Sequence, residues 1–83
     1  MNVKKGLIVK AIAGRDNGKF FVVIEIEEGS KFCYIADGDE RKLASPKRKS
    51  LRHLRVTSRV IDLNDMLTDK KLREVLKEYR LGG

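Results

Sequence analysis

The chain has no tryptophan, one proline and one cysteine. A single cysteine, Cys33, cannot form an internal disulfide, which is typical of a reducing compartment. No apolar run in the sequence approaches the roughly 18 residues that suggest a membrane span. Near the N-terminus, Lys10 interrupts the apolar stretch 7–13, so no signal peptide is predicted. These absences predict a cytoplasmic protein with no membrane partner.

Residues that bind metals or carry catalysis are also scarce. Cys33 and His53 are the only cysteine and the only histidine, and no metal-ligand spacing is present. Residues 14–19 (GRDNGK) are a poor match to a phosphate-binding loop, because the glycines stand too close together and Phe20 occupies the place of the Mg²⁺-binding serine or threonine. We interpret Cys33 as a buried structural thiol. We predict that the protein is not an enzyme and has no cofactor or metal.

What the chain does have is enough apolar sequence for one small domain. It has 83 residues, of which 41% are apolar and 37% are charged. That balance is typical of a soluble globule rather than of a disordered chain. A chain this short buries only roughly 60% of its unfolded surface, so it needs a compact fold. We therefore expect one domain and a monomer.

The first half of the chain predicts short β-strands. Residues 6–13 are apolar and β-branched, and residues 20–27 alternate with the period of a strand. Residues 31–36 are a third stretch of this kind. In the second stretch, one face of the strand is predicted to carry Phe20, Val22, Ile24 and Ile26.

Two dipeptides mark the turns between these strands. Asn17-Gly18 predicts a two-residue hairpin, because both positions tolerate a positive φ, and Asp37-Gly38 predicts a second tight turn. Short strands at this spacing, in a chain too small for a sandwich, predict a small antiparallel barrel. We interpret the acidic side chains of the second turn as solvated; they are Asp37, Asp39 and Glu40.

The C-terminal part of the chain changes to the pattern of a helix. Thr68 is a suitable N-cap, and Leu67 and Leu72 have the spacing of a hydrophobic staple. We expect a helix over residues 68–80 that packs on the barrel, with docking to a partner protein as the alternative use of its apolar side. The apolar stripe at helical spacing consists of Leu72, Val75, Leu76 and Tyr79.

Between these two parts lies a concentration of positive charge. Residues 41–55, hereafter the basic block, read RKLASPKRKSLRHLR and contain seven lysine or arginine residues, one histidine and no acidic residue. The flanking segments are nearly balanced, so almost all of the net charge of +7 comes from the basic block. Pro46 favours a loop or a sheet edge. We expect a basic loop within a barrel of residues 1–61, with a last strand or short 3₁₀ turn after it, and a helical segment of residues 62–83.

The first predicted strand–loop–strand unit resembles a known motif. Residues 6–23, GLIVKAIAGRDNGKFFVV, are similar to the KOW motif, which combines alternating apolar residues, a central glycine (here Gly14) and a short basic loop before a second strand. The likeness continues through YIADG at residues 34–38 and more weakly through the basic block. The segment 34–38 resembles the strand and turn that follow the motif in archaeal and eukaryotic ribosomal large-subunit proteins, and over its whole length the chain is similar to small bacterial KOW-domain RNA-binding proteins. The resemblance implies an SH3-like barrel, RNA binding and a ribosome-linked role.

A nucleic-acid partner would contact a surface built from two segments. The KOW-like loop contributes two cations, and the basic block contributes the rest. We expect a polyanion to bind here, because positive charges that are not compensated repel one another. Few aromatic residues accompany these cations, so we expect contact with the backbone and shape of structured RNA rather than reading of its sequence. The predicted RNA-binding residues are Arg15, Lys19, Arg41, Lys42, Lys47, Arg48, Lys49, Arg52, His53 and Arg55.

The leading hypothesis is an RNA-binding protein of the translation machinery, which contacts ribosomal or other structured RNA. The alternative is a protein-interaction module that docks on a ribosomal or transcription protein. A further alternative is that the basic block is a solvated segment with no partner.

Overall fold

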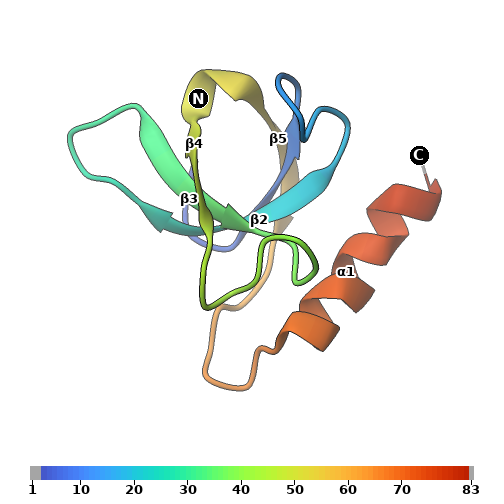
Figure 1. The fold of residues 1–83 in the computed structure, drawn as a ribbon. Helices are drawn as coiled ribbons and strands as arrows, with labels where there is room; N and C mark the ends of the chain where they lie inside the picture. The colour runs from blue at the N-terminus through green and yellow to red at the C-terminus, as the bar shows by residue number, and fades with distance from the viewer. Residues whose placement is uncertain (1–2, 83) are drawn as a thin grey trace.

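One antiparallel sheet and one helix make up the fold. The structure is a computed structural model that describes residues 3–82. Its elements are β1 (Leu7–Ala11), β2 (Phe20–Ile26), β3 (Phe32–Ala36), β4 (Lys47–Ser50), the 3₁₀ turn η1 (Leu51–His53), β5 (Leu54–Val60) and α1 (Asp69–Gly82). The strands lie in the order β4-β3-β2-β1-β5, and α1 lies beside the sheet (Figure 1). The predicted mostly-β fold with a C-terminal helix is confirmed.

The sheet is strongly curved, and its two edge strands are β4 and β5 (Figure 1). The two edges are joined at one end through η1, but no backbone pairing links them within residues 3–82. β1 pairs with β5, so that Ala11 lies opposite Leu54 and Leu7 lies opposite Val60. The sheet therefore stays open between β4 and β5. The complete closure of a barrel, which the sequence predicted, is not seen in this part of the chain.

Both faces of the sheet carry apolar clusters. The face enclosed by the curve, hereafter the enclosed face, buries apolar side chains of β1, β2, β3 and β5. The opposite face is covered by α1, whose Leu72 and Leu76 pack with Ile8 and Val22 of the two central strands. The main buried residues of the enclosed face are Leu7, Val9, Ala11, Phe21, Val23, Cys33, Ile35 and Leu54.

A β-bulge in β2 places Ile26 on the face opposite to the one predicted. The register between β2 and β3 shifts between Val23 and Glu25, which adds one residue to β2. Because side chains alternate along a strand, one extra residue exchanges the two faces beyond it. Ile26 therefore packs against the cluster of the enclosed face, whereas Ile24 packs with the cluster under α1.

The connection between β1 and β2 is longer than the predicted two-residue hairpin. It spans residues 12–19, and its positive φ values belong to Gly14 (78°) and Gly18 (90°). Asn17 does not have a positive φ, since only glycines do so among residues 3–82. An Asn-Gly turn of the hairpin type needs positive φ at both positions, so that prediction is wrong. The longer loop reaches across to β4, as described below.

The basic block is not a single loop, and this prediction is also wrong. Its second half forms β4, η1 and the start of β5. Only residues 41–46 belong to the loop that joins β3 to β4. Pro46 stands immediately before the edge strand β4, a position that needs no backbone donor. The predicted 3₁₀ turn and last strand are confirmed.

Helix α1 begins with the predicted cap. The backbone N–H of Lys71 donates to Thr68 Oγ1 at 3.1 Å, and Leu67 and Leu72 belong to the same apolar cluster. Leu72 and Leu76 are buried against the sheet, so the apolar stripe packs within the molecule as predicted. No helix within residues 3–82 is both long and apolar enough to cross a membrane.

The start of α1 also holds the β3–β4 loop. The backbone N–H of Leu43 donates to Asp69 Oδ1 at 2.8 Å, and Arg73 Nη1 donates to the carbonyl of Gly38 at 2.6 Å. Gly38 has a φ of 80°, and a Cβ at this position would collide with the carbonyl oxygen of Asp69. The close approach of loop and helix therefore requires glycine here.

Candidate nucleic-acid interface

Two of the predicted RNA-binding residues, Lys47 and Arg41, instead contact the buried carboxylate of Asp16. This carboxylate of the β1–β2 loop has only 2% of its surface exposed. Its Oδ2 accepts a hydrogen bond from Lys47 Nζ at 2.8 Å, and Arg41 Nη2 lies 3.8 Å away. The β1–β2 loop, the β3–β4 loop and β4 therefore meet at one buried carboxylate.

Two opposing effects act on the pKa of Asp16. Burial is the largest single effect and raises it, because desolvation disfavours the charged carboxylate. The hydrogen bond from Lys47 and the charges of Lys47, Arg41 and Lys49 act in the opposite direction and together outweigh burial. The pKa of Asp16 is therefore below its usual value, and Asp16 is ionised at neutral pH.

Lys47 and Lys49 point toward the enclosed face of the sheet. In the register of β4 with β3 they lie opposite Ile35 and Cys33, which are core residues of that face. Lys49 is 7% exposed, and its Nζ donates to the carbonyl of Ala13 at 3.1 Å. These lysines link β4 to the β1–β2 loop where the strands themselves are not paired. Inward-pointing charges on an edge strand also discourage edge-to-edge association.

Arg48 points to the opposite face and is engaged there. Its Nε and Nη2 each donate to the Glu27 carboxylate at 2.9 Å, and its guanidinium carbon lies 3.7 Å from the centre of the Phe32 ring. The hydroxyl of Tyr34 donates to the same carboxylate at 3.3 Å. The hydrogen bonds from Arg48 are the main reason why the pKa of Glu27 falls to about 2. Arg48 therefore fastens β4 to the turn between β2 and β3.

The acidic turn after β3 is structured, whereas the sequence suggested solvation alone. Asp37 Oδ1 accepts hydrogen bonds from the backbone N–H groups of Asp39 and Arg41, each at 2.9 Å. Glu40 forms an ion pair with Lys19 at 3.2 Å. Both members of this pair are well exposed, so it contributes little to stability, but it joins the acidic turn to the end of the β1–β2 loop.

The structure divides the predicted RNA-binding residues into two groups. The first group has a carboxylate or carbonyl partner within the fold and consists of Lys19, Arg41, Lys47, Arg48 and Lys49. The side chains of the second group make no ion pair or hydrogen bond with any other residue in the range 3–82. This group consists of Arg15, Lys42, Arg52, His53 and Arg55. Lys42 is separated from the others, since its neighbour Leu43 is bound to the start of α1.

The other four residues of the second group gather around η1. The backbone N–H of Ile12 donates to the carbonyl of His53 at 2.9 Å, so the β1–β2 loop, which carries Arg15, adjoins η1. Figure 1 shows this loop and η1 at the same end of the sheet. Lys10 of β1 joins the group because it is the direct partner of Arg55 in β5. We name this surface the basic end, and it consists of Lys10, Arg15, Arg52, His53 and Arg55.

Lys10 and Arg55 are like charges in a direct cross-strand position. Such side chains share one face of the sheet, and like charges there are destabilising. The end of α1 is close, because Lys10 Nζ lies 5.6 Å from the centre of the Phe20 ring and Tyr79 packs on that ring at 5.0 Å between centroids. The negative end of the helix dipole offsets part of the positive charge. The rest is available to an external anion.

Lys10 is a residue that the charge pattern of the sequence did not single out. It is an isolated cation in an apolar strand, far along the chain from the basic block. The only signal in the sequence is that a charged residue stands between two apolar ones, Val9 and Ala11. Both of these are fully buried in the structure. Its place beside Arg55 depends on the pairing of the first strand with the last.

Three of the aromatic side chains are engaged with other side chains. Phe21 is fully buried, and Phe20 is packed against Tyr79. Phe32 lies beneath the guanidinium of Arg48. Four of the five residues of the basic end are lysine or arginine, which favours contact with phosphates.

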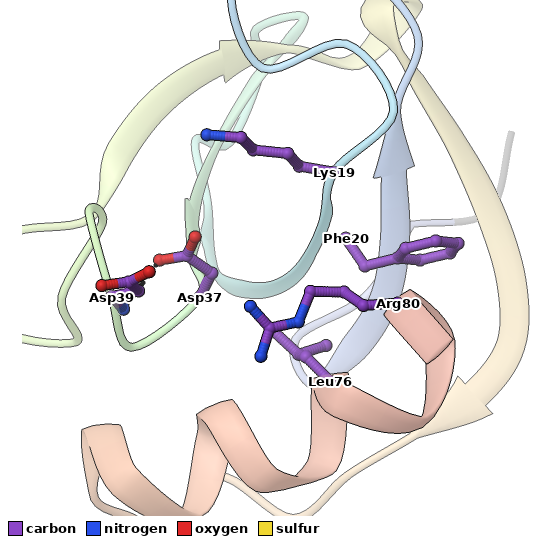
Figure 2. A pocket seen from close by; sticks show the side chains of 6 residues that line it. All are labelled: Lys19, Phe20, Asp37, Asp39, Leu76 and Arg80. Atoms are coloured by element: carbon purple, nitrogen blue, oxygen red, sulfur yellow. Dashed lines mark hydrogen bonds between the residues drawn. The ribbon is translucent and has the colours of Figure 1, made fainter. Parts of the chain in front are cut away.

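A small pocket lies next to the basic end (Figure 2). Its volume is about 90 Å³, and Figure 2 shows the guanidinium of Arg80 reaching toward Asp37 and Asp39, with Lys19 on the other side. Arg80 was not singled out in the sequence, because it lies on the mixed-charge side of a helix. The lining residues are Lys19, Phe20, Asp37, Asp39, Leu76 and Arg80.

The single cysteine is structural. Cys33 is fully buried, as predicted, and burial raises the pKa of its thiol to about 11, so the reactive thiolate is not formed at neutral pH. Within residues 3–82, no group of three or more histidine, cysteine, aspartate or glutamate side chains is arranged to hold a metal ion.

A comparison of the chain with models of known protein families finds no match. The KOW resemblance therefore depends on the residues of this sequence alone. The segment that carries the resemblance, residues 6–23, corresponds to β1, the β1–β2 loop and the first part of β2.

Proposed function

We propose that this protein binds structured RNA through its basic end and acts in the translation machinery. The observation that carries the proposal is the cross-strand pair of Lys10 and Arg55, which has no carboxylate partner within residues 3–82. The other cations of the basic end surround that pair. The KOW-like sequence of residues 6–23 supports RNA rather than another polyanion and supports a link to ribosomes.

Binding would act mainly through the phosphate backbone. Arginine presents a planar fork that suits phosphate oxygens, and Lys10 acts as a mobile point charge. If about four phosphates are neutralised, the logarithm of the affinity falls with the logarithm of the salt concentration with a slope of about −2.8 to −3.6. Since four of the five residues of the basic end are lysine or arginine, the shape and backbone of folded RNA matter more than its base sequence.

A triple variant, Arg15→Ala with Arg52→Ala and Arg55→Ala, tests this proposal. We expect its affinity for an RNA hairpin, measured by filter binding at low salt, to fall about tenfold or more. The salt slope should become shallower by about 2 to 3, because each lost phosphate contact removes about one unit.

The matched control removes the same charge from the exposed side of α1, as Lys70→Ala, Lys71→Ala and Lys77→Ala. We expect this control to change affinity much less, because its residues are not at the basic end. An equal loss in both variants would show that only net charge matters, and an unchanged affinity in the first would refute the basic end as the RNA site.

The alternative, a protein-interaction module, loses the surface that the sequence suggested for it. Leu72 and Leu76 of α1 are buried against the sheet and are not free to contact a partner. Sedimentation with ribosomes separates the two hypotheses. Association that is lost after RNase treatment or at high salt supports RNA binding, whereas salt-resistant capture of one protein supports the alternative.

A further inference from the structure

The pocket of Figure 2 combines charges of both signs, and the proposal for the basic end does not account for it. Lys19 stands at the start of β2, Asp37 and Asp39 belong to the turn after β3, and Arg80 belongs to the last turns of α1. The apolar part of the wall comes from Phe20 and Leu76. Three segments that are distant in sequence therefore build one small polar hollow.

Several polar groups of the pocket have no side-chain partner. Asp37 uses Oδ1 to bind two backbone N–H groups, but no hydrogen bond or ion pair within residues 3–82 involves its Oδ2. The carboxylate of Asp39 and the guanidinium of Arg80 also make none, and Figure 2 shows the guanidinium on the side of the pocket where the two aspartates lie. A pocket with both acceptors and a donor suits the edge of a ligand that both donates and accepts.

The pocket adjoins the basic end. Phe20 lines the pocket, and Lys10 Nζ lies 5.6 Å from the centre of its ring. Lys19 also lines the pocket and ends the loop that carries Arg15. An RNA backbone held at the basic end would therefore pass close to the opening of the pocket. A volume of about 90 Å³ admits the edge of one base but not a whole nucleotide.

We propose that this pocket takes the Watson–Crick edge of one unpaired guanine, from an RNA that is held at the basic end. The inference rests on the proposed function. Guanine presents two adjacent donors, N1–H and the N2 amino group, next to the acceptor O6. A carboxylate from Asp37 or Asp39 accepts from both donors, and Arg80 donates to O6. Adenine, cytosine and uracil each lack the pair of adjacent donor groups on that edge, and unpaired bases are the ones that proteins read in RNA.

Four RNA hairpins test the inference; they are identical except for one bulged nucleotide, which is G, A, C or U. We expect the full chain to bind the G hairpin about fivefold or more tightly than the other three, as measured by fluorescence anisotropy. Asp37→Asn and Asp39→Asn are made singly, and the variant of the carboxylate that contacts guanine should reduce that preference, because the amide replaces an acceptor by a donor. Asp37→Asn keeps the Oδ1 that binds the turn, so it should fold normally, which circular dichroism checks.

The matched control is Asp65→Asn, which makes the same change of charge at an exposed residue outside the pocket and should retain the preference for G. Equal binding of all four hairpins would overturn the inference and leave the proposed function standing; this is the result if Arg80 merely neutralises the two aspartates. A preference for G that survives in both pocket variants would place guanine elsewhere and overturn it too. Failure to bind any hairpin would overturn the proposed function and the inference together.

Discussion

Gly38 lies where the turn after β3 touches the first turn of α1. Its φ is 80°, and a Cβ there would collide with the backbone of Asp69. Gly29, in the turn between β2 and β3, has a similar φ of 74°, but nothing lies within 4 Å of the position that its Cβ would take. The two glycines therefore separate the cost of a left-handed backbone from the cost of a steric contact.

We predict that Gly29→Ala lowers the free energy of unfolding by about 1 kcal/mol, the usual cost of a left-handed conformation. Gly38→Ala should lower it by about 3 kcal/mol or more, because α1 must also move away from the turn. Urea unfolding of the two variants measures both values. A similar loss of unfolding free energy in the two variants would mean that the turn after β3 can move away from α1 at no cost in stability.

At the residue scale, the sequence does not reveal which charged side chains pair with one another. Lys47 and Arg48 were expected to face a polyanion, but their partners Asp16 and Glu27 lie 31 and 21 residues earlier in the chain. Counting charge along the sequence misses such pairs, because strand register and loop length decide which side chains meet. The exposure of the remaining cations of the basic block follows from the same register, and their contact with RNA stays a prediction.

At the scale of secondary-structure elements, α1 acts as a cover for the sheet. It hides the apolar face that Ile8 and Val22 present, and it does so mainly through Leu72 and Leu76. Ala36 is buried in the same cluster, so the sheet would expose an apolar patch without the helix. The stability of the strands and the docking of α1 are therefore coupled.

We predict that Leu72→Ala lowers the free energy of unfolding by about 2–5 kcal/mol, because it leaves a cavity between α1 and the sheet. Met66→Ala, at a residue that is 72% exposed just before the helix, should change it by less than about 0.5 kcal/mol. Thermal or urea unfolding followed by circular dichroism compares the two. A small effect of Leu72→Ala would show that α1 is only loosely attached.

Element type was predictable where the signal is local. The helix follows from its cap at Thr68 and from its own apolar spacing, both of which lie within one segment. The β-bulge that turns Ile26 and the strand formed by residues 47–50 are different, because tertiary pairing with β3 creates them. Lysine and arginine have little intrinsic preference for strands, so only the neighbouring strand makes this segment extended.

At the scale of the whole molecule, side-chain bonds bridge what the sheet leaves open. β4 has no second strand beside it, yet Lys47 and Lys49 fasten it to the β1–β2 loop and Arg48 fastens it to Glu27. Backbone pairing with β3 and side-chain bonds to Asp16 and Glu27 thus both hold the edge strand β4 in place. Acid should weaken this arrangement, since both Asp16 and Glu27 act in their charged form.

We predict that stability falls as the pH drops below about 4.5. The pKa of Glu27 is about 2 in the folded protein against 4.5 for a free side chain, and that of Asp16 is also lowered, from 3.8. A lowered pKa adds stability above the unfolded value and loses it as the pH falls through the folded one. Urea unfolding between pH 7 and pH 2.5 measures this loss.

Asp16→Asn should weaken the pH dependence and cost about 3 kcal/mol at pH 7, because Lys47 loses its charged partner. Asp65→Asn is the control, since Asp65 is exposed and forms no ion pair within residues 3–82. A pH profile of Asp16→Asn that matches the unsubstituted protein would show that other carboxylates govern acid unfolding.

The pairing of β1 with β5 has a consequence for the order of folding. Strands β1, β2, β3 and β4 follow one another in the sequence and in the sheet, so they can assemble from near neighbours. Only the pairing of β5 with β1 joins distant segments, and it closes a loop of more than half the chain. Closing so large a loop costs entropy before any contact is gained, so it slows folding. β5 should therefore be among the last strands to gain protection from hydrogen exchange during refolding.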